Sequence, residues 1–258
     1  MTVEDDNNAR TNRVEAGDGA ARIRIVLVEP SHPGNVGAAA RAMKTMTLSR
    51  LHLIKPSRFP SAEATARAAG ADDILYRAAV HDDLQDALSG CCFVVGTSAR
   101  ARHLQWPALA PRGCASKLVE QSVGGSVAMV FGRENSGLTN QELELCHAVV
   151  RIPTSSTFSS LNVAAAVQIL CYEVRLALSD LQGTTEELRT RDAVTSEQLE
   201  GFYEHLRTTL IQIGYLDESA PKLLMRRLRR LFSRAGVERA ELNILRGVLA
   251  AVQHKIRR

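Results

Sequence analysis

The segment SHPGNVGAAARAM, residues 31–43, comes directly after the apolar run IRIVLV and the pair Glu29-Pro30, and it decides how the chain can fold. A β-branched run followed by glycines and alanines is typical of a buried strand that turns into a helix packed closely on a sheet. Arg41 is the one charged side chain within this small-residue stretch. The segment therefore predicts the first unit of a parallel α/β sheet and leaves the role of Arg41 to be explained.

A dinucleotide-binding turn is one interpretation of this segment. That turn needs G-x-G-x-x-G and an acidic residue at the end of the second strand. Here alanine replaces the third glycine, and Lys55 stands where the acidic residue should be. An NAD-dependent enzyme is therefore disfavoured. A plainer interpretation assigns the glycines and alanines to close helix packing and leaves Arg41 in solvent.

Length and composition favour a globular chain. With 258 residues and 45% hydrophobic content, it can bury the core of one large domain, or of a medium and a small one. No apolar run approaches the roughly 20 residues that span a bilayer, and the first residues are polar and acidic, so we expect a cytoplasmic protein with a disordered tail over residues 1–21. The cysteines have neither C-x-x-C pairing nor histidines at ligand spacing, so we expect buried reduced thiols and no metal site, at Cys91, Cys92, Cys114, Cys146 and Cys171.

Further strand-like runs alternate with helical stretches over residues 22–182, which predicts one parallel α/β domain. Thr139 and Glu142 form a capping-box pattern, and a long helix is expected to begin near Ser160. The expected strands cover residues 23–28, 51–54, 92–96, 127–131 and 148–152.

The chain changes character after residue 182. Residues 183–195 are polar and read as a linker, and residues 196–258 carry only helical periodicity, which predicts a small all-helical C-terminal domain. From residue 222 onward there are eleven Lys and Arg against two Glu, which indicates an acidic partner such as nucleic acid. Two roles are expected for the arginines of residues 226–234. They bind phosphates of the partner, or they form a solvent-exposed face that covers a dimer contact.

Two more segments follow strands and carry polar side chains. These are FGRENSGLT, residues 131–139, and IPTSSTFSSLNVAAAVQ, residues 152–168. The carboxyl ends of parallel strands meet at one edge of a sheet, where open α/β sheets bind ligands. We therefore expect these two segments and the segment of residues 31–43 to share one site.

In this order the three segments resemble the SPOUT superfamily of knotted methyltransferases, in its branch that methylates the ribose 2′-hydroxyl of RNA. The first segment fits N-x-G-x-x-x-R through Asn35, Gly37 and Arg41. The second fits G-x-E-x-x-G-L through Gly132, Glu134, Gly137 and Leu138, and the third fits an S-L-N-V motif at residues 160–163. VVGTSARARHLQWP, residues 94–107, and the helical C-terminus narrow the resemblance to members that act on tRNA at nucleotide 32 of the anticodon loop.

The resemblance implies that the end of the α/β domain forms a trefoil knot and that the active unit is a homodimer. It also implies S-adenosylmethionine as methyl donor, with S-adenosylhomocysteine as product, and tRNA with cytidine or uridine as substrate. The family's cofactor-contacting positions map onto Thr97, Ser98, Ala99, Gly132, Ile152, Ser159, Ser160 and Leu161. For Ser159 and Ser160 a helix cap is the alternative, and for Gly132 we expect close approach of the backbone to the ligand.

The catalytic group implied by the resemblance consists of Arg41, Asn35, Glu134, Ser160 and Asn162. The resemblance implies that Arg41 acts as the base, but a guanidinium stays protonated in proteins, so a clamp on phosphate and on the developing oxyanion is an alternative at least as well founded. Asn35 and Glu134 are expected to orient groups in the site. Asn162 and Ser160 are expected to order the helix start and contact a substrate phosphate, and His32 is expected to be a surface or turn residue.

Other functions stay open at this point. The motifs serve methyl transfer and do not select the nucleotide, so another tRNA position or ribosomal RNA is an alternative. A non-catalytic RNA-binding knot protein is a further alternative. Arg100, Arg102, His103 and Trp106 are candidate RNA contacts, with packing as the other role for Trp106.

Overall fold

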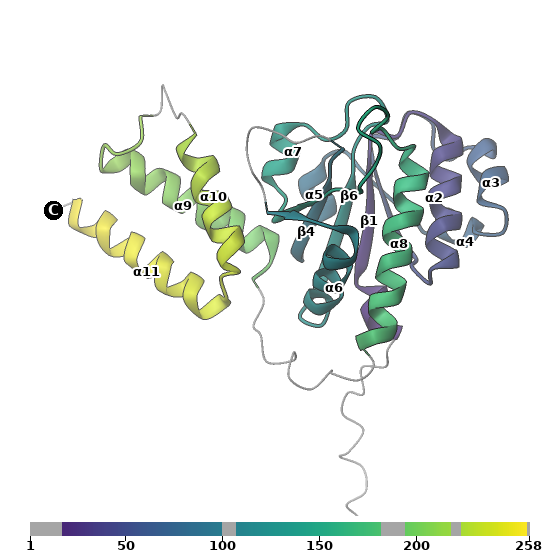
Figure 1. Ribbon diagram of the computed structural model, residues 1–258. Coiled ribbons are helices and arrows are strands. Elements are labelled where there is room, and N and C mark those ends of the chain that lie inside the picture. Colours follow the sequence, from purple (N-terminus) through teal and green to yellow (C-terminus); the bar gives the residue numbers. More distant parts are fainter. Residues whose placement is uncertain (1–16, 100–106, 182–193, 218–222, 257–258) are drawn as a thin grey trace, which may run out of the picture.

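The computed structural model describes residues 17–99, 107–181, 194–217 and 223–256 (Figure 1). Its centre is a seven-stranded sheet in the order β3-β2-β1-β6-β4-β7-β5, and every neighbouring pair is parallel. The strands are β1 (Ile23–Val28), β2 (Arg50–Ile54), β3 (Ala79–His81), β4 (Cys91–Thr97), β5 (Ala108–Leu109), β6 (Ser126–Phe131) and β7 (Ala148–Val150).

All five predicted strands are present, although β7 ends at Val150, two residues before the predicted end. The sequence did not predict β3 and β5, which lie at the two edges of the sheet. They have three and two residues. Such short, partly exposed strands lack the apolar run that identifies a buried strand.

Helices cover both faces of the sheet, and each face has its own core. Ile23, Ile25 and Leu27 of β1 pack with α2, α3, α6 and α8, whereas Val26 and Val28 pack with α5 and α7. Burial on both faces explains the uninterrupted apolar run of β1. The helices of this unit are α1 (Gly17–Ala21), α2 (Pro33–Thr45), α3 (Ala62–Ala68), α4 (Asp72–Tyr76), α5 (Leu84–Leu88), α6 (Pro111–Ser122), α7 (Asn140–Glu144) and α8 (Val163–Asp180).

Strand order places the polar segments together. β1 lies between β2 and β6, and the strands are parallel. The connections after β1 and β6 therefore start side by side at the carboxyl ends of the strands. β4 and β7 follow next to β6, and their connections start at these ends too. The direction of chain progression changes between β1 and β6, which is where open α/β sheets form a crevice for ligands.

Two expected boundaries need correction. The tail was expected to extend to residue 21, but residues 17–21 form α1, and Ala20 packs against the core. The long helix was expected to begin near Ser160, but α8 begins at Val163 with Asn162 as its N-cap. Asn162 accepts backbone hydrogen bonds from two residues of the first turn, so the loop extends to Asn162 and α8 begins three residues later than expected.

Among the residues that the structure describes, the C-terminal unit contains three helices: α9 (Ser196–Gln212), α10 (Leu224–Ala235) and α11 (Arg239–Ile256). Thr195 and Gln198 make the predicted capping box at the start of α9. Their core contains Leu199, Phe202 and Leu242, together with Val194 from the end of the expected linker; residues 182–193 lie outside the described part of the chain. Figure 1 shows this unit beside the end of the α/β unit that carries α7.

The five cysteines are all buried and unpaired, as expected for structural thiols. Burial raises the pKa of Cys91 to about 11 and that of Cys114 to about 12. These thiols therefore stay protonated and pack as small apolar side chains.

Candidate active site

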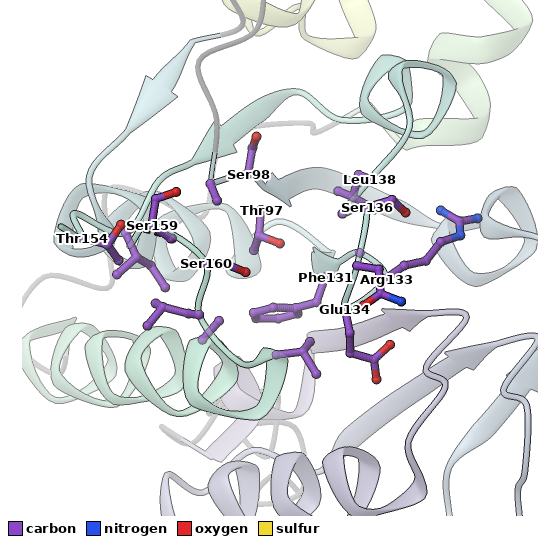
Figure 2. A pocket seen from close by; sticks show the side chains of 18 of the residues that line it. Thr97, Ser98, Phe131, Arg133, Glu134, Ser136, Leu138, Thr154, Ser159 and Ser160 are labelled. Atoms are coloured by element: carbon purple, nitrogen blue, oxygen red, sulfur yellow. Dashed lines mark hydrogen bonds between the residues drawn. The ribbon is translucent and has the colours of Figure 1, made fainter. Parts of the chain in front are cut away.

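A pocket opens at the carboxyl ends of β4, β6 and β7, and the first turn of α8 closes one side of it. Figure 2 shows Thr97 and Ser98 in this pocket together with Thr154, Ser159 and Ser160 from the connection after β7. Its apolar wall includes Phe131 and Leu138. All eight positions expected to contact a cofactor line it: Thr97, Ser98, Ala99, Gly132, Ile152, Ser159, Ser160 and Leu161.

Glu134 lies between this pocket and the first turn of α2. It lines the pocket, and its carboxylate accepts hydrogen bonds from the Ser31 backbone at 3.2 Å and the Ser31 hydroxyl at 3.0 Å. The Asn35 amide and the His32 backbone donate to it as well, at 3.1 and 3.4 Å. Burial raises the pKa of Glu134, but hydrogen bonds from its own backbone, Asn35 and Ser31 outweigh this, so the pKa lies below its usual value. Glu134 is therefore an ionised acceptor at neutral pH.

A directed chain of hydrogen bonds joins the three motifs. The side-chain oxygen of Asn162 accepts from the backbone of Ala164 at 2.9 Å, so its amide nitrogen must be the group that donates to Asn35 Oδ1, at 2.9 Å. The Asn35 amide nitrogen then donates to Glu134, which can only accept. The orientation of both asparagines is thus fixed from two ends, by a helix N-terminus and by a carboxylate.

Gly132 is required by the loop itself. A Cβ at this position would lie 2.2 Å from the Gly137 carbonyl carbon and 2.3 Å from the Leu138 nitrogen. From the sequence we expected glycine at 132 because the backbone approaches a ligand. The structure shows a different reason, which is that the second motif folds back and brings the backbone of Gly137 and Leu138 against Gly132.

Arg133 fastens the same loop to its surroundings and points away from the pocket in Figure 2. It forms ion pairs with Glu29 after β1, at 2.5 Å, and with Glu142 on α7, at 3.0 Å. Hydrogen bonds with Glu29 and Glu142 raise the pKa of Arg133. The sequence around Arg133 did not predict this role, because it does not show that carboxylates from two other segments lie close to Arg133.

Arg41 lies apart from the pocket. It is on the exposed side of α2, outside the pocket lining, and its guanidinium has no hydrogen-bonding or ionic partner within the described part of the chain. The interpretation of the glycines as packing residues is supported at Gly37, where a Cβ would lie 2.1 Å from the Ala64 carbonyl oxygen of α3. His32 is exposed and its side chain makes no cap for α2.

Asn35 and Asn162 contact Glu134 and α8, and neither lines the pocket. Ser159 and Ser160 do not cap α8, because Asn162 has that role. The sequence did not indicate a role for Ser31, which lies four residues before Asn35 of the first motif and donates to Glu134 through its backbone and its hydroxyl. The candidate RNA contacts Arg100, Arg102, His103 and Trp106 lie outside the described residues.

The arginines of α10 fall into two groups. Arg226 pairs with Glu144 of α7 at 2.6 Å, and Arg229 pairs with Glu200 and lies over the Tyr203 ring at 4.4 Å. These two hold the helix to its neighbours. Arg227, Arg230 and Arg234 make no side-chain hydrogen bond or ion pair with the rest of the described chain, and their spacing places them on one face of α10.

Comparison with known proteins shows the family. Residues 22–172 match the model of the SpoU rRNA Methylase family, which is more than half of the chain. The chain belongs to this family. Residues 197–258 match a second model, described as tRNA methyltransferase TrmJ, C-terminal domain. The expectations of a methyltransferase, and of S-adenosylmethionine as its methyl donor, are confirmed by this membership.

Curated relatives match over nearly the full chain. TrmJ of Pseudomonas aeruginosa, described as a tRNA (cytidine/uridine/adenosine-2′-O-)-methyltransferase, is 53% identical over 242 residues, which cover 90% of this chain and 94% of the relative. TrmJ of Escherichia coli K12, described as a tRNA (cytidine/uridine-2′-O-)-methyltransferase, is 49% identical over 235 residues, which cover 90% and 96%.

A solved structure supports the same architecture. TrmJ from Z. mobilis aligns with a TM-score of 0.78 at 31% identity, over 90% of this chain and all of that one. The predicted parallel α/β sheet with a helical C-terminal unit is therefore confirmed, and the SPOUT knot is consistent with this neighbour.

Proposed function

We propose that this SpoU-family chain is an S-adenosylmethionine-dependent tRNA methyltransferase that modifies the ribose 2′-hydroxyl of cytidine or uridine at nucleotide 32 in the anticodon loop. The observation that carries the proposal is the hydrogen-bonded chain from Glu134 through Asn35 to Asn162, which joins all three motifs beside the pocket. The descriptions of the TrmJ relatives, and the match of residues 197–258, favour tRNA over ribosomal RNA.

The pocket suits S-adenosylmethionine, a sulfonium cation that carries an adenosine. Phe131, Leu138 and Ile152 offer an apolar surface for the adenine, and the hydroxyls of Thr97 and Ser160 offer partners for polar groups. Arg133 is the basic residue among those that line the pocket, but its side chain points away and pairs with two carboxylates, while Glu134 remains negative. The charge balance therefore favours a cationic ligand.

The bound cofactor supplies an electrophilic methyl group for attack by the ribose hydroxyl. We assign to Arg41 the tasks of clamping an RNA phosphate and stabilising the negative charge that develops on the 2′-oxygen. Its guanidinium is exposed and unpaired in the described chain, so it is available for such a partner. Asn35 and Asn162 hold the first turn of α2 against the start of α8, which orients the substrate side relative to the pocket.

We further propose that the active unit is a homodimer in the cytoplasm. Large apolar side chains are exposed beside the pocket and on α8, at Phe158, Leu161 and Tyr172. Large exposed apolar side chains such as these are available to an interface with a second copy of the chain. Within the described residues, no helix is both long and apolar enough to cross a membrane.

Mass-spectrometric mapping of 2′-O-methyl groups in total RNA, from cells with and without the gene, tests the proposal. We expect loss of the methyl group at tRNA nucleotide 32, and its return when the gene is restored. Loss at another tRNA position, or in ribosomal RNA, would overturn the assignment of the substrate, and no change in any RNA would overturn the proposed activity.

A further inference from the structure

Two arginines outside the three motifs belong to segments that contact the residues around the start of α2. Arg58 follows β2, and Arg67 is in the last turn of α3. Both are exposed, and neither guanidinium has a hydrogen-bonding or ionic partner within the described ranges. Arginines that stabilised the fold would be expected to show partners, as Arg133 and Arg229 do.

The glycines of the first motif set the path of Arg67. A Cβ on Gly37 would lie 2.9 Å from the Arg67 Cβ, and a Cβ on Gly34 would lie 3.6 Å from its Cγ and 3.9 Å from its Nε. The side chain therefore runs along α2 from Gly37 back to Gly34, toward the turn that contains Asn35. Small residues at both positions leave room for this path.

Arg58 is held close to the same turn. The preceding residue, Ser57, donates its backbone N–H to the Pro30 carbonyl at 3.2 Å and its hydroxyl to the Ser31 carbonyl at 2.8 Å. Ser31 in turn donates to Glu134. The segment that carries Arg58 is thus fixed to the residues that border the pocket.

We propose that Arg58 and Arg67 bind phosphates of the RNA substrate, on the side of Glu134 that faces away from the pocket. The inference rests on the proposed function and deepens it by naming residues that hold the RNA backbone beside the site. Glu134 is engaged by Ser31 and Asn35. The Glu63 carboxylate lies beside the Arg67 side chain near Gly34, but it forms no ion pair with Arg67 among the described residues, so the Arg67 guanidinium keeps its donors for a phosphate. Planar guanidiniums spaced around a rigid turn match a phosphodiester backbone.

The test uses Arg58→Gln and Arg67→Gln in the full chain, with tRNA binding measured over a series of salt concentrations. We expect each variant to weaken tRNA binding by about tenfold. The slope of log affinity against log salt should become shallower by about one for each arginine removed. The KM for tRNA should rise while kcat and the affinity for S-adenosylmethionine stay unchanged, because neither residue lines the pocket.

Arg77→Gln is the matched control. Arg77 is also exposed, but it precedes β3 and therefore lies at the amino ends of the parallel strands, opposite the end that carries the pocket. Arg67→Lys separates charge from packing, since it should keep most of the salt slope. If Arg58→Gln and Arg67→Gln bind tRNA as Arg77→Gln does, with unchanged slopes, the inference is wrong even though wild-type protein methylates tRNA. Failure of the wild-type protein to methylate tRNA would overturn the proposed function instead.

Discussion

Arg41 and the pocket are separate in the structure, which makes their contributions separable. The Arg41 side chain is exposed on α2, and all residues expected to contact the cofactor lie elsewhere. We predict that Arg41→Ala lowers methyl transfer to tRNA by about a hundredfold to a thousandfold, as expected when a transition-state charge loses its stabilising group. Calorimetry should show unchanged binding of S-adenosylmethionine. Substantial turnover by this variant would contradict the assigned role.

Asn162 has two tasks that different substitutions can separate. Its oxygen caps α8 and its amide nitrogen donates to Asn35. Asn162→Asp keeps the cap but removes the donor, and Asn35 cannot satisfy a carboxylate on each side with one amide group. We predict that Asn162→Asp loses activity at nearly wild-type stability. Asn162→Ala should lose activity and also about 1 kcal/mol of stability. Thermal unfolding and a methylation assay on both variants give the comparison, and an active Asn162→Asp enzyme would show that the link to Asn35 is dispensable.

Helix α10 shows why a pattern of charges does not by itself define a surface. The sequence alone does not distinguish the arginines of this helix. In the structure Arg226 and Arg229 form ion pairs, whereas the other three, Arg227, Arg230 and Arg234, form none with the described residues. Only contacts from α7 and α9 distinguish the two groups.

We predict that replacing Arg227, Arg230 and Arg234 together by Gln weakens tRNA binding and makes its salt dependence shallower by about two to three. Arg226→Gln should leave that slope nearly unchanged, because its partner is Glu144. Fluorescence anisotropy with labelled tRNA measures both. Equal slopes for the triple variant and the wild type would assign this face to another role.

The stability of the whole molecule depends on pH through histidines that are neutral in the folded state. His147 is half-buried and packs against Phe93, and its Nδ1 accepts a hydrogen bond from the Val94 backbone at 3.1 Å. Burial lowers the pKa of His147 to about 4, against about 6.5 in an unfolded chain. The unfolded state therefore binds a proton first as the pH falls, so the stabilisation is present above about pH 6.5 and is lost toward pH 4.

We predict that the free energy of unfolding falls by about 2 kcal/mol from this group between pH 7 and pH 5. Burial lowers the pKa of His52 to about 4 as well, so it adds in the same direction. Denaturant titrations at the two pH values measure the change. His147→Asn retains an acceptor but does not titrate, and it should reduce the pH dependence; an unchanged dependence would show that His147 is not its source.

Local sequence determined those features that depend on neighbours along the chain. Apolar runs predicted five of the seven strands, and the capping boxes at Thr139 and Thr195 predicted two helix starts. The motif spacings indicated the family and the pocket residues, because each motif is a short segment whose backbone and side chains act together.

Tertiary structure alone decided what depends on segments far apart in the chain. Asn35 meets Glu134 and Asn162 across about a hundred residues because β1, β6 and β7 end at one edge of the sheet. The need for glycine at 132 arises where the loop meets its own backbone, five residues further along the chain. The sequence shows which side chains can donate or accept a hydrogen bond. Which of them become partners depends on the order of the strands in the sheet, because that order brings distant segments together.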